Sequence, residues 1–366
     1  MQEETLVALI SDLIRMENTH PAAINKSAEY CANWLSQRGV QAQLRENRGL
    51  KMVVASCSPA VRPRASVILN GHLDVVPGSP ADFVPRLEGG KLFGRGSYDM
   101  LGAVAVMMML TAELAKNPLG IQVVLKLVPD EEQGGELGTG YLVDNGVLGD
   151  FVICGEPTNL GVAVQAKGVL QLEIESTGEA AHGSRPWLGK NAILQAMEDY
   201  RSIASLDFLK ASSPYFSKPS FNLAKIQGGG ALNQVPDSCA FHLDIRYLPN
   251  QNPEELVEQV RRAVPNAAVR VVQHGAPVQT DEHDKHVQQL LQAAEEVTKT
   301  KVRVFGQDGS ADTRFYAKHA IPAVEFGPAG ANHHGPDEHV EIASLMTYHA
   351  ILQQFIKRLG RKEGSE

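Results

Sequence analysis

The sequence predicts an α/β protein in which a mostly parallel sheet is flanked by helices and interrupted by a smaller α+β domain. Short apolar runs without polar alternation, at 123–128 and 151–154, are typical of strands that are buried on both faces. Helical stretches separate these runs, as they do in a parallel sheet covered by helices. Between residues 168 and 278 the strands alternate apolar and polar residues, which indicates an antiparallel sheet with one face in water.

Helices and strands alternate in the first part of the chain. Leucine and isoleucine recur with helical spacing over residues 5–16. A second helix is expected over 22–38, because Gly39 is a common residue just beyond a helix end. Two strands are then expected at 53–56 and 66–70, a helix at 103–115, and two further strands at 123–128 and 151–154.

The alternating pattern of the second domain lies at 169–176 and 239–245, with helical stretches at 191–203 and 253–263. The αβ pattern then returns, with helices at 286–298, 312–318 and 341–359 and strands near Val302 and at 323–326. We therefore expect one discontinuous domain of residues 1–167 and 279–366, and an inserted domain of residues 168–278.

The composition restricts the class of protein. A formal net charge of −8 argues against non-specific binding to nucleic acid, which needs a basic surface. The longest apolar stretch, 102–110, is shorter than the roughly 20 residues that cross a membrane, so no membrane partner is expected. The four cysteines are widely spaced and the N-terminus does not resemble a signal peptide, so we expect free thiols and a cytoplasmic location. The tail after Leu359 is expected to be disordered.

Five short motifs place acidic or imidazole side chains just after predicted strands or beside glycine-rich turns. In an open α/β sheet, ligands bind at the carboxyl ends of the strands, so one site could collect all of these side chains. The candidates are His72 and Asp74 in N-G-H-L-D-V-V-P, Asp99 in G-R-G-S-Y-D-M, Glu131 and Glu132 in P-D-E-E, Glu156 in C-G-E-P-T, and His333 and His334 in H-H-G-P-D-E.

Two imidazoles and three carboxylates are enough to bind two metal ions, and one further carboxylate would serve as a base. Glu131 and Glu132 would divide the roles of ligand and general base, and Asp74 is placed to orient a metal-binding His72. Each motif alone also has a simpler explanation, such as a loop hydrogen bond, a helix N-cap at Asp99 or a solvated charge cluster. No G-x-S-x-G or G-x-x-x-x-G-K-[ST] motif offers a competing chemistry.

Six ordered motifs resemble those of a known family: G-H-x-D-V-V-P, G-R-G-x-x-D-M, D-E-E, G-E-P-T, H-x-x-R-P-x-x-G-x-N-A-I and H-x-x-D-E. They are similar to the motifs of the cocatalytic dizinc amidohydrolases and peptidases, which include acetylornithine deacetylase, succinyl-diaminopimelate desuccinylase, aminoacylase and glutamate carboxypeptidase. The resemblance implies that the discontinuous domain is a zinc-peptidase-like catalytic domain. It also implies that the inserted domain is a lid or dimerisation domain, and that the protein is a homodimer.

The resemblance implies a role for each site residue. His72 and Glu156 would bind one Zn²⁺, Glu132 and His334 the other, and Asp99 would bridge the two, with a cis peptide bond after it. The remaining roles are the general base for Glu131, orientation of His72 for Asp74, polarisation of the scissile carbonyl for His182, and substrate binding for Asn233, Arg246 and Arg314. The chain departs from the family at Leu101, where a lysine is usual, and at Gly183, where a serine is common.

The function expected from these residues is metal-dependent hydrolysis of the amide bond of N-acyl amino acids, as in a deacetylase or desuccinylase. Two Zn²⁺ per subunit are expected, with Co²⁺ or Mn²⁺ as possible substitutes. A di- or tripeptidase or a carboxypeptidase of the same family is the main alternative, because it would use the same metals on an amide beside a carboxylate. A non-catalytic binder of amino-acid conjugates and a single-metal enzyme are two further alternatives.

Overall fold

The computed structural model describes residues 2–57 and 65–363, and side chains up to residue 360. The chain forms two compact units. Unit 1 comprises residues 1–164, 280–305 and 311–366, and unit 2 comprises residues 165–279 and 306–310. The short segment 306–310 thus belongs to unit 2, although its position in the sequence suggested the larger domain.

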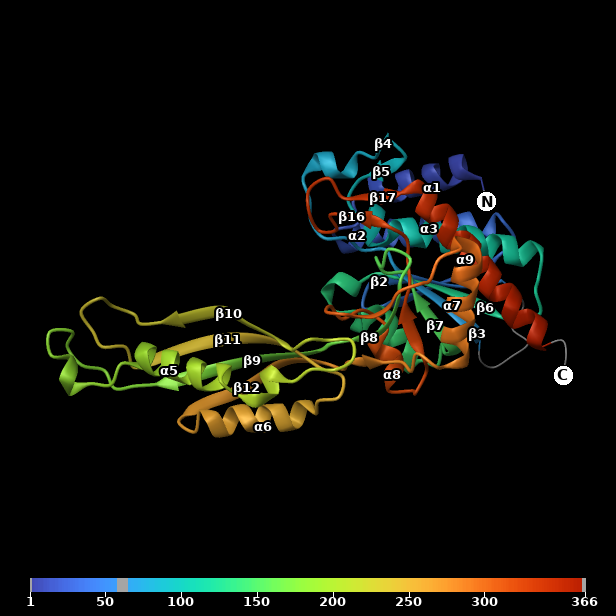
Figure 1. Ribbon diagram of the computed structural model, residues 1–366. Coiled ribbons are helices and arrows are strands. Elements are labelled where there is room, and N and C mark those ends of the chain that lie inside the picture. Colours follow the sequence, from blue (N-terminus) through green and yellow to red (C-terminus); the bar gives the residue numbers. More distant parts are fainter. Residues whose placement is uncertain (1, 58–64, 364–366) are drawn as a thin grey trace. The chain divides into compact units, whose positions relative to one another are not determined.

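The largest sheet has nine strands, and its centre is parallel (Figure 1). Its path is β1 (Gln41–Asn47), β2 (Leu50–Ser56), β6 (Val123–Val128), β3 (Ala65–His72), β7 (Gly149–Cys154), β15 (Ala323–Glu325), β8 (Val162–Ala166) and β13 (Val278–Gln279), and β14 (Val304–Gln307) pairs with β8. The neighbours β6, β3, β7 and β15 are parallel. The pairs β1–β2, β2–β6, β15–β8 and β8–β13 are antiparallel. The predicted parallel sheet is therefore found at its centre, and its two ends are antiparallel.

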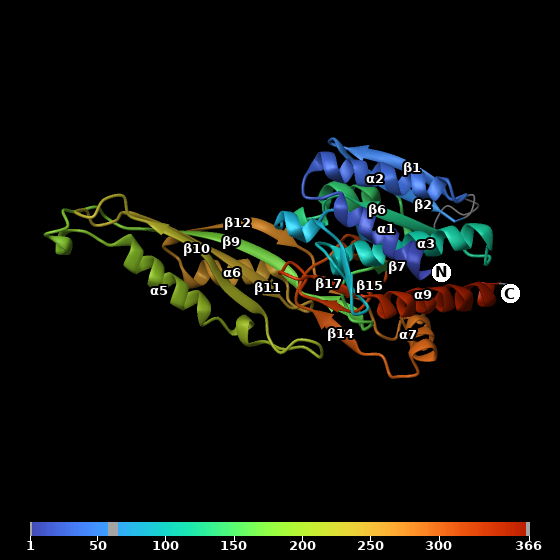
Figure 2. The same cartoon turned by 90° about the horizontal axis from the view of Figure 1, so that it is seen from above.

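Helices cover both faces of the sheet, as the continuous apolar strands require. On β7, the ring of Phe151 contacts those of His286 and Phe355, whereas Val152 packs in a cluster with Tyr316 on the opposite face. These contacts place α7 (Lys285–Thr298) and α9 (Ile342–Glu363) on one face, where the two helices lie side by side (Figure 2), and α8 (Arg314–Ala317) on the other. The helices of unit 1 are α1 (Glu3–Arg15), α2 (Pro21–Ser36), α3 (Gly102–Lys116), α4 (Tyr141–Asp144), α7 (Lys285–Thr298), α8 (Arg314–Ala317) and α9 (Ile342–Glu363).

Helix α3 is apolar on all sides because it lies inside unit 1. The stretch Ser97–Lys116 is long and apolar enough to cross a membrane by length and composition, but 83% of its most apolar window is buried within the structure. A helix that is apolar all round is typical of a protein core. Helix α9 continues to Glu363, so the expectation of a disordered tail is wrong for residues 360–363, and residues 364–366 lie outside the described part of the chain.

A small antiparallel sheet joins segments that are far apart in the sequence. Its strands follow the order β16 (Gly330–Ala331), β17 (His339–Glu341), β5 (Lys91–Phe93) and β4 (Arg86–Glu88). His339 is paired with Phe93 in the register between β17 and β5. This pairing brings the segment before α3 next to the segment before α9.

Unit 2 is an antiparallel sheet with two helices on one face. The strand order is β10 (Ser220–Gly228), β11 (Ser238–Tyr247), β9 (Gly168–Thr177) and β12 (Ala267–Gly275), and the helices are α5 (Ala192–Ala204) and α6 (Pro253–Ala263). Leu172 and Leu243 are paired in register and pack with Ala196 and Val260 of the helices. The opposite face of the sheet is polar, so the alternation seen in the sequence marks the face that packs against the helices.

Candidate metal centre

Three of the predicted site segments meet because parallel strands end at the same edge of the sheet. His72 is the last residue of β3, Glu131 and Glu132 follow β6, and Glu156 follows β7. His72 is level with Val128 in the pairing of β3 with β6, so the ends of these two strands coincide. Hence the sheet itself gathers an imidazole and several carboxylates.

The other two donors come from irregular segments. Asp99 lies in the turn η2 (Ser97–Leu101), which leads directly into α3, and the peptide bond Asp99–Met100 is cis, as the resemblance implies. His334 lies between β16 and β17 and has a positive φ of 61°. The ring of the neighbouring His333 is 5.5 Å from that of His334, and His333 is not part of either donor group among the described residues.

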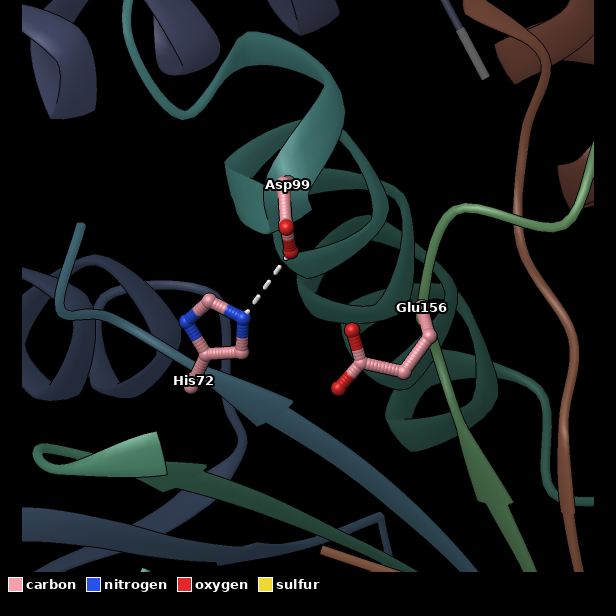
Figure 3. Close-up of side chains that lie close together, drawn as sticks. All are labelled: His72, Asp99 and Glu156. Carbon is pink, nitrogen blue, oxygen red and sulfur yellow. Dashed lines mark hydrogen bonds and ion pairs between the residues drawn. The ribbon is translucent and has the colours of Figure 1, made fainter. Parts of the chain in front are cut away.

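Five side chains form two donor groups that share one carboxylate. His72, Asp99 and Glu156 place one donor atom each within 4.8 Å of one another (Figure 3), and so do Asp99, Glu132 and His334. Asp99 uses a different oxygen for each group, because Oδ1 lies 3.2 Å from Nε2 of His72 and Oδ2 lies 3.2 Å from Nε2 of His334. A carboxylate in this position can bridge two metal ions.

His72 is oriented by Asp74. Nδ1 of His72 lies 2.8 Å from the backbone oxygen of Asp74 and 3.6 Å from its carboxylate. A ring N–H at Nδ1 leaves Nε2 as the ligand atom, and Nε2 faces Asp99. The carboxylate of Asp74 accepts hydrogen bonds from the backbone N–H groups of Glu131, at 3.2 Å, and Glu132, at 3.0 Å. Asp74 thus connects the His72 segment to the acidic segment after β6.

Burial and crowding raise the proton affinity of the site. Burial raises the pKa of Glu156 well above its usual range, and the charge of Glu131 adds to this effect. Burial likewise raises the pKa of Glu131, which also faces Asp99 and Glu132. Hydrogen bonds from His334 to Asp99 and Glu132 raise the pKa of that imidazole to about 10. If its carboxylates take up no protons, the site therefore carries more negative charge than its histidines can neutralise.

The donor set fits a pair of divalent cations. Imidazole nitrogen and carboxylate oxygen are both usual ligands of Zn²⁺, and two such ions would compensate the crowded carboxylates. Each group offers three protein donors, which leaves room for water or substrate at each ion, as in catalytic sites. His72 and Glu156 would hold one ion, Glu132 and His334 the other, with Asp99 between them.

Glu131 lies at this centre without belonging to either donor group. It begins the short turn η3 (Glu131–Gln133), where Asp74 holds its backbone N–H. Its carboxylate interacts electrostatically with His72 and Asp99, which places it beside the donors. A partly buried carboxylate with a raised pKa next to a metal-bound water would have the properties of a general base.

A buried polar network supports the turn that carries these acids, and sequence reasoning missed most of it. Asp312 accepts hydrogen bonds from Oγ1 of Thr139, at 2.5 Å, and from the side-chain amide of Asn70, at 3.2 Å. A Cβ at Gly135, where φ is +74°, would lie 2.3 Å from Oδ1 of Asp312. Asp312 lies two residues before Arg314 in the segment S-A-D-T-R-F, and this proximity is the only signal for the network in the sequence.

Arg314 binds that same turn. Its guanidinium donates to the backbone oxygen of Gly134 and lies 3.3 Å from Oε1 of Glu136. The predicted role of Arg314 in substrate binding stays a prediction. In this structure Arg314 contacts Gly134, which follows Glu132 by two residues in the chain.

The other predicted substrate residues lie in unit 2. Nδ1 of His182 accepts a hydrogen bond from the backbone N–H of Ser184, at 3.1 Å, which leaves the proton of the neutral ring on Nε2. Gly183 donates to the backbone oxygen of Asn233 at 2.7 Å, and a Cβ at Gly183 would lie 2.9 Å from that backbone. This close approach explains the glycine at a position where the resemblance implies serine. Arg246 forms a bidentate ion pair with Asp244, at 2.8 and 3.2 Å.

Two groups of candidate metal donors that share a carboxylate, at the carboxyl ends of parallel strands and beside a spare, partly buried glutamate, are typical of a metal-dependent hydrolase. Comparison with known proteins gives the particular family. Residues 68–358 match peptidase family M20/M25/M40, and the chain belongs to this family. The resemblance inferred from the motifs is thereby confirmed, and the protein is an amidohydrolase of the metallopeptidase type.

Curated relatives match over most of the chain. The succinyl-diaminopimelate desuccinylase of Gluconobacter oxydans (strain 621H) is 30% identical over 387 residues, which cover 97% of this chain and 97% of the relative. The enzyme of the same name from Rhizorhabdus wittichii is 32% identical over 308 residues, which cover 78% of this chain and 80% of the relative.

Solved structures show the same fold. An aminopeptidase from Bacillus cereus ATCC 10987 is matched with a TM-score of 0.83 at 19% identity, over 98% of each chain. A tripeptidase from Staphylococcus aureus is matched with a TM-score of 0.80 at 19% identity, over 99% of each chain. The α/β fold class predicted from the sequence is therefore confirmed.

Proposed function

We propose that the protein hydrolyses the amide bond of N-acyl amino acids with two Zn²⁺ ions per subunit, and that N-succinyl or N-acetyl groups are the acyl groups removed. The observation that carries this proposal is Asp99, whose two carboxylate oxygens belong to two different donor groups. The desuccinylases among the relatives support the choice of acyl group. Co²⁺ or Mn²⁺ would be accepted by the same nitrogen and oxygen donors.

The chain's own residues supply the proton transfers. Metal ions held by the two groups would supply a lowered pKa for a water molecule in the site. Glu131 would take the proton of that water and deliver it to the leaving amine. Burial, the largest cause that raises the pKa of Glu131, favours the protonated carboxyl group that exists between these two steps. Asp74 keeps Glu131 in place through the backbone hydrogen bond described above.

Four residues would bind and polarise the substrate. We assign the N–H at Nε2 of His182 to the scissile carbonyl oxygen, because the hydrogen bond from Ser184 fixes that tautomer. Arg246 and Arg314 would bind the carboxylate of the substrate, for which guanidinium groups offer two parallel hydrogen bonds. Asn233, whose backbone contacts Gly183, would bind the carbonyl group next to His182.

We further propose a homodimer formed by unit 2. Strand β10 is an edge strand whose residues are mostly exposed, and the apolar side chains of Leu223 and Ile226 are exposed on it. Leu194 and Met197 on helix α5 are also exposed. Pairing of β10 with the same strand of a second copy would satisfy its free edge and cover these side chains. We place the enzyme in the cytoplasm, which agrees with four buried, free cysteines.

A substrate panel tests this function. Metal-stripped enzyme is incubated with N-acetyl amino acids, N-succinyl amino acids and dipeptides, with and without Zn²⁺, and the released amine is measured. We expect zinc-dependent release from the N-acyl amino acids. Release from the dipeptides alone would make the enzyme an exopeptidase of the same family. No release from any member, despite two bound ions per chain, would support a binder of amino-acid conjugates.

The bridging role has its own test. Asp99→Ala removes the donor that both groups share, so it should abolish binding of at least one metal ion. Elemental analysis after dialysis measures the number of ions per chain, and Asp12→Ala is the control, since Asp12 bonds Arg15 and Tyr30 on α1 and α2. Full occupancy in Asp99→Ala would contradict the bridge.

A further inference from the structure

Arg95 and Glu338 form a buried ion pair next to two of the proposed ligands. Nη1 of Arg95 lies 2.7 Å from Oε2 of Glu338, and both side chains are at most 5% exposed. The two residues are 243 positions apart in the sequence. Neither was singled out from the sequence as a site residue, although Glu338 is the last residue of the motif H-x-x-D-E.

Glu338 contacts the segment that carries Asp99. Its second oxygen, Oε1, accepts hydrogen bonds from the backbone N–H groups of Tyr98 and Asp99, both at 3.1 Å. The backbone oxygen of Glu338 accepts from the N–H of Gly94 at 2.9 Å. Both ends of the Gly94–Asp99 segment are therefore attached to the same glutamate.

Arg95 contacts the segment that carries His334. Its Nη2 lies 3.5 Å from the backbone oxygen of His334, while Nη1 binds Glu338. The small sheet explains how these residues meet, because β5 ends just before Gly94 and β17 begins just after Glu338. The pairing of two short strands thus brings a guanidinium and a carboxylate together, each of which contacts a different ligand-bearing segment.

We propose that Arg95 and Glu338 are positioning residues that set the distance between Asp99 and His334, and so control the affinity of the metal site formed by Asp99, Glu132 and His334. This inference rests on the proposed metal centre and adds the device that holds it together. His334 lies in an irregular loop with its side chain 46% exposed, and packing alone therefore restrains it weakly. The contact between Arg95 and Glu338 is a short, charge-assisted hydrogen bond, which is the stronger kind, whereas the contact of Arg95 with the backbone of His334 is longer, at 3.5 Å.

The proposal predicts a larger effect on one metal site than on the other. Glu338→Ala removes the acceptor for both backbone N–H groups, and we expect about 10- to 100-fold weaker binding at the site that contains His334, as is usual for residues that orient ligands. The site that contains His72 and Glu156 should lose less affinity, because β3 and β7 hold these two donors and only the shared Asp99 depends on Glu338. Glu338→Gln keeps an oxygen acceptor, so it should fall between Glu338→Ala and the unmodified protein.

Zinc titration of metal-stripped protein against a competing chelator measures both dissociation constants. Two single variants, His334→Ala and His72→Ala, identify the site that is affected. Adding Glu338→Ala to His334→Ala should weaken zinc binding little further, because the site that contains His334 is already damaged. Adding Glu338→Ala to His72→Ala should remove most of the remaining zinc binding. Asp199→Ala is the matched control, since Asp199 is also a buried carboxylate that accepts two side-chain hydrogen bonds, from Ser176 and Gln195, but it lies in unit 2.

The outcomes separate the positioning role from the metal centre. Selective weakening of one site in Glu338→Ala, with both sites unchanged in Asp199→Ala, supports the proposal. Two unchanged dissociation constants in Glu338→Ala would overturn it and leave the metal centre intact. Equal losses in Glu338→Ala and Asp199→Ala would overturn it too, because they would indicate a general loss of stability. Failure of the unmodified protein to bind two ions would instead contradict the proposed metal centre. If Glu338→Ala does not fold, Glu338→Gln and Arg95→Lys give the same comparison.

Discussion

Lys126 lies in the middle of the central strand β6 and is fully buried. Its ammonium group donates to the backbone oxygen of Val147 at 2.6 Å and to the hydroxyl of Tyr316 at 3.0 Å. Burial lowers the pKa of Lys126 to about 7. Because Tyr316 also donates to Asn70, this lysine lies at the far end of the polar network that includes Asp312. The apolar run 123–128 gave no sign that its one polar residue would have such partners.

Replacing Lys126 should change how stability depends on pH. The folded protein loses this proton near pH 7, whereas the unfolded chain keeps it up to about pH 10.4. The unfolded state therefore binds more protons within this window, and lysine makes stability rise with pH there, by at most about 1.4 kcal/mol per pH unit. Below pH 7 its destabilising effect is present in full.

In Lys126→Met we expect higher stability at pH 7 than in the unmodified protein, and a difference that shrinks toward pH 10. Urea unfolding at several pH values between 6 and 10 measures this difference. Lys357→Met, which changes an exposed lysine on α9, should leave the slope as it is. A parallel pH dependence in Lys126→Met and the unmodified protein would show that Lys126 keeps its proton throughout.

Glu131 is the residue on which the chemical step should depend most. Glu131→Gln keeps the shape and the backbone hydrogen bond to Asp74 but cannot accept the proton of a water molecule. We expect kcat to fall by about 10²–10⁴-fold with two metal ions still bound, as is typical on loss of a general base. Glu295→Gln, on the exposed side of α7, is the control. A fall in kcat of less than about 10²-fold in Glu131→Gln would assign the role of the base to another group.

At the scale of elements, the sequence pattern located the long helices and the central strands but missed the pairings that form between distant short segments. Buried strands such as β6 and β7 are recognisable because they are apolar on both faces, and the ends of the central strands lie beside three of the proposed ligand segments. Strands β4, β5, β16 and β17 have two or three residues each, too few for a period to be visible. The predicted strand near Val302 is β14, which begins at Val304.

The sequence pattern did not reveal the residues that support the site, for the same reason. Glu338 and Arg95 meet only through the pairing of β5 with β17, and Asp312 meets Thr139 only through the packing of α8 beside the sheet. Long-range contacts of this kind leave no local signal. The proposed ligands could be selected from the sequence because their residue types and their positions after strands both have chemical meaning.

A glycine after β15 illustrates how one element positions another. A Cβ at Gly327 would lie 2.2 Å from the backbone oxygen of Glu156 and 2.6 Å from that of Gly155. Gly327→Ala should therefore push away the end of β7, cost about 1–3 kcal/mol of stability and weaken the metal site that contains Glu156. Thermal unfolding and zinc titration measure both effects. Gly230→Ala is the control, because a Cβ there meets nothing within 4 Å; equal behaviour of the two variants would contradict the packing argument.

At the scale of the whole molecule, the division into two units separates the metal donors from the proposed carbonyl-binding histidine. All five donors lie in unit 1, whereas His182, Asn233 and Arg246 lie in unit 2. Unit 2 also has the exposed strand edge for which we propose a second copy. Its helix-covered face was predictable from the alternation in β9 and β11, while its two edge strands, β10 and β12, were not predicted.

The proposed dimer can be tested on the two edges of one sheet. Ile226→Lys on β10 places a charge where we expect a second copy, so it should shift the protein from dimer to monomer. Val272→Lys on β12 changes a side chain of similar exposure, 47% against 49%, at the opposite edge and should leave the dimer intact. Sedimentation equilibrium measures the mass of each. A dimer that survives Ile226→Lys but not Val272→Lys would move the interface to β12.

The discontinuity of unit 1 also has a consequence for biosynthesis. Four of the proposed donors precede residue 165, but His334 follows the whole of the inserted unit. A nascent chain emerging from the ribosome would therefore display His72, Asp99, Glu132 and Glu156 long before the second ion has its last ligand. Loading of both proposed metal sites would then wait until unit 2 and His334 have been translated, so we expect metal insertion to follow the synthesis of unit 2.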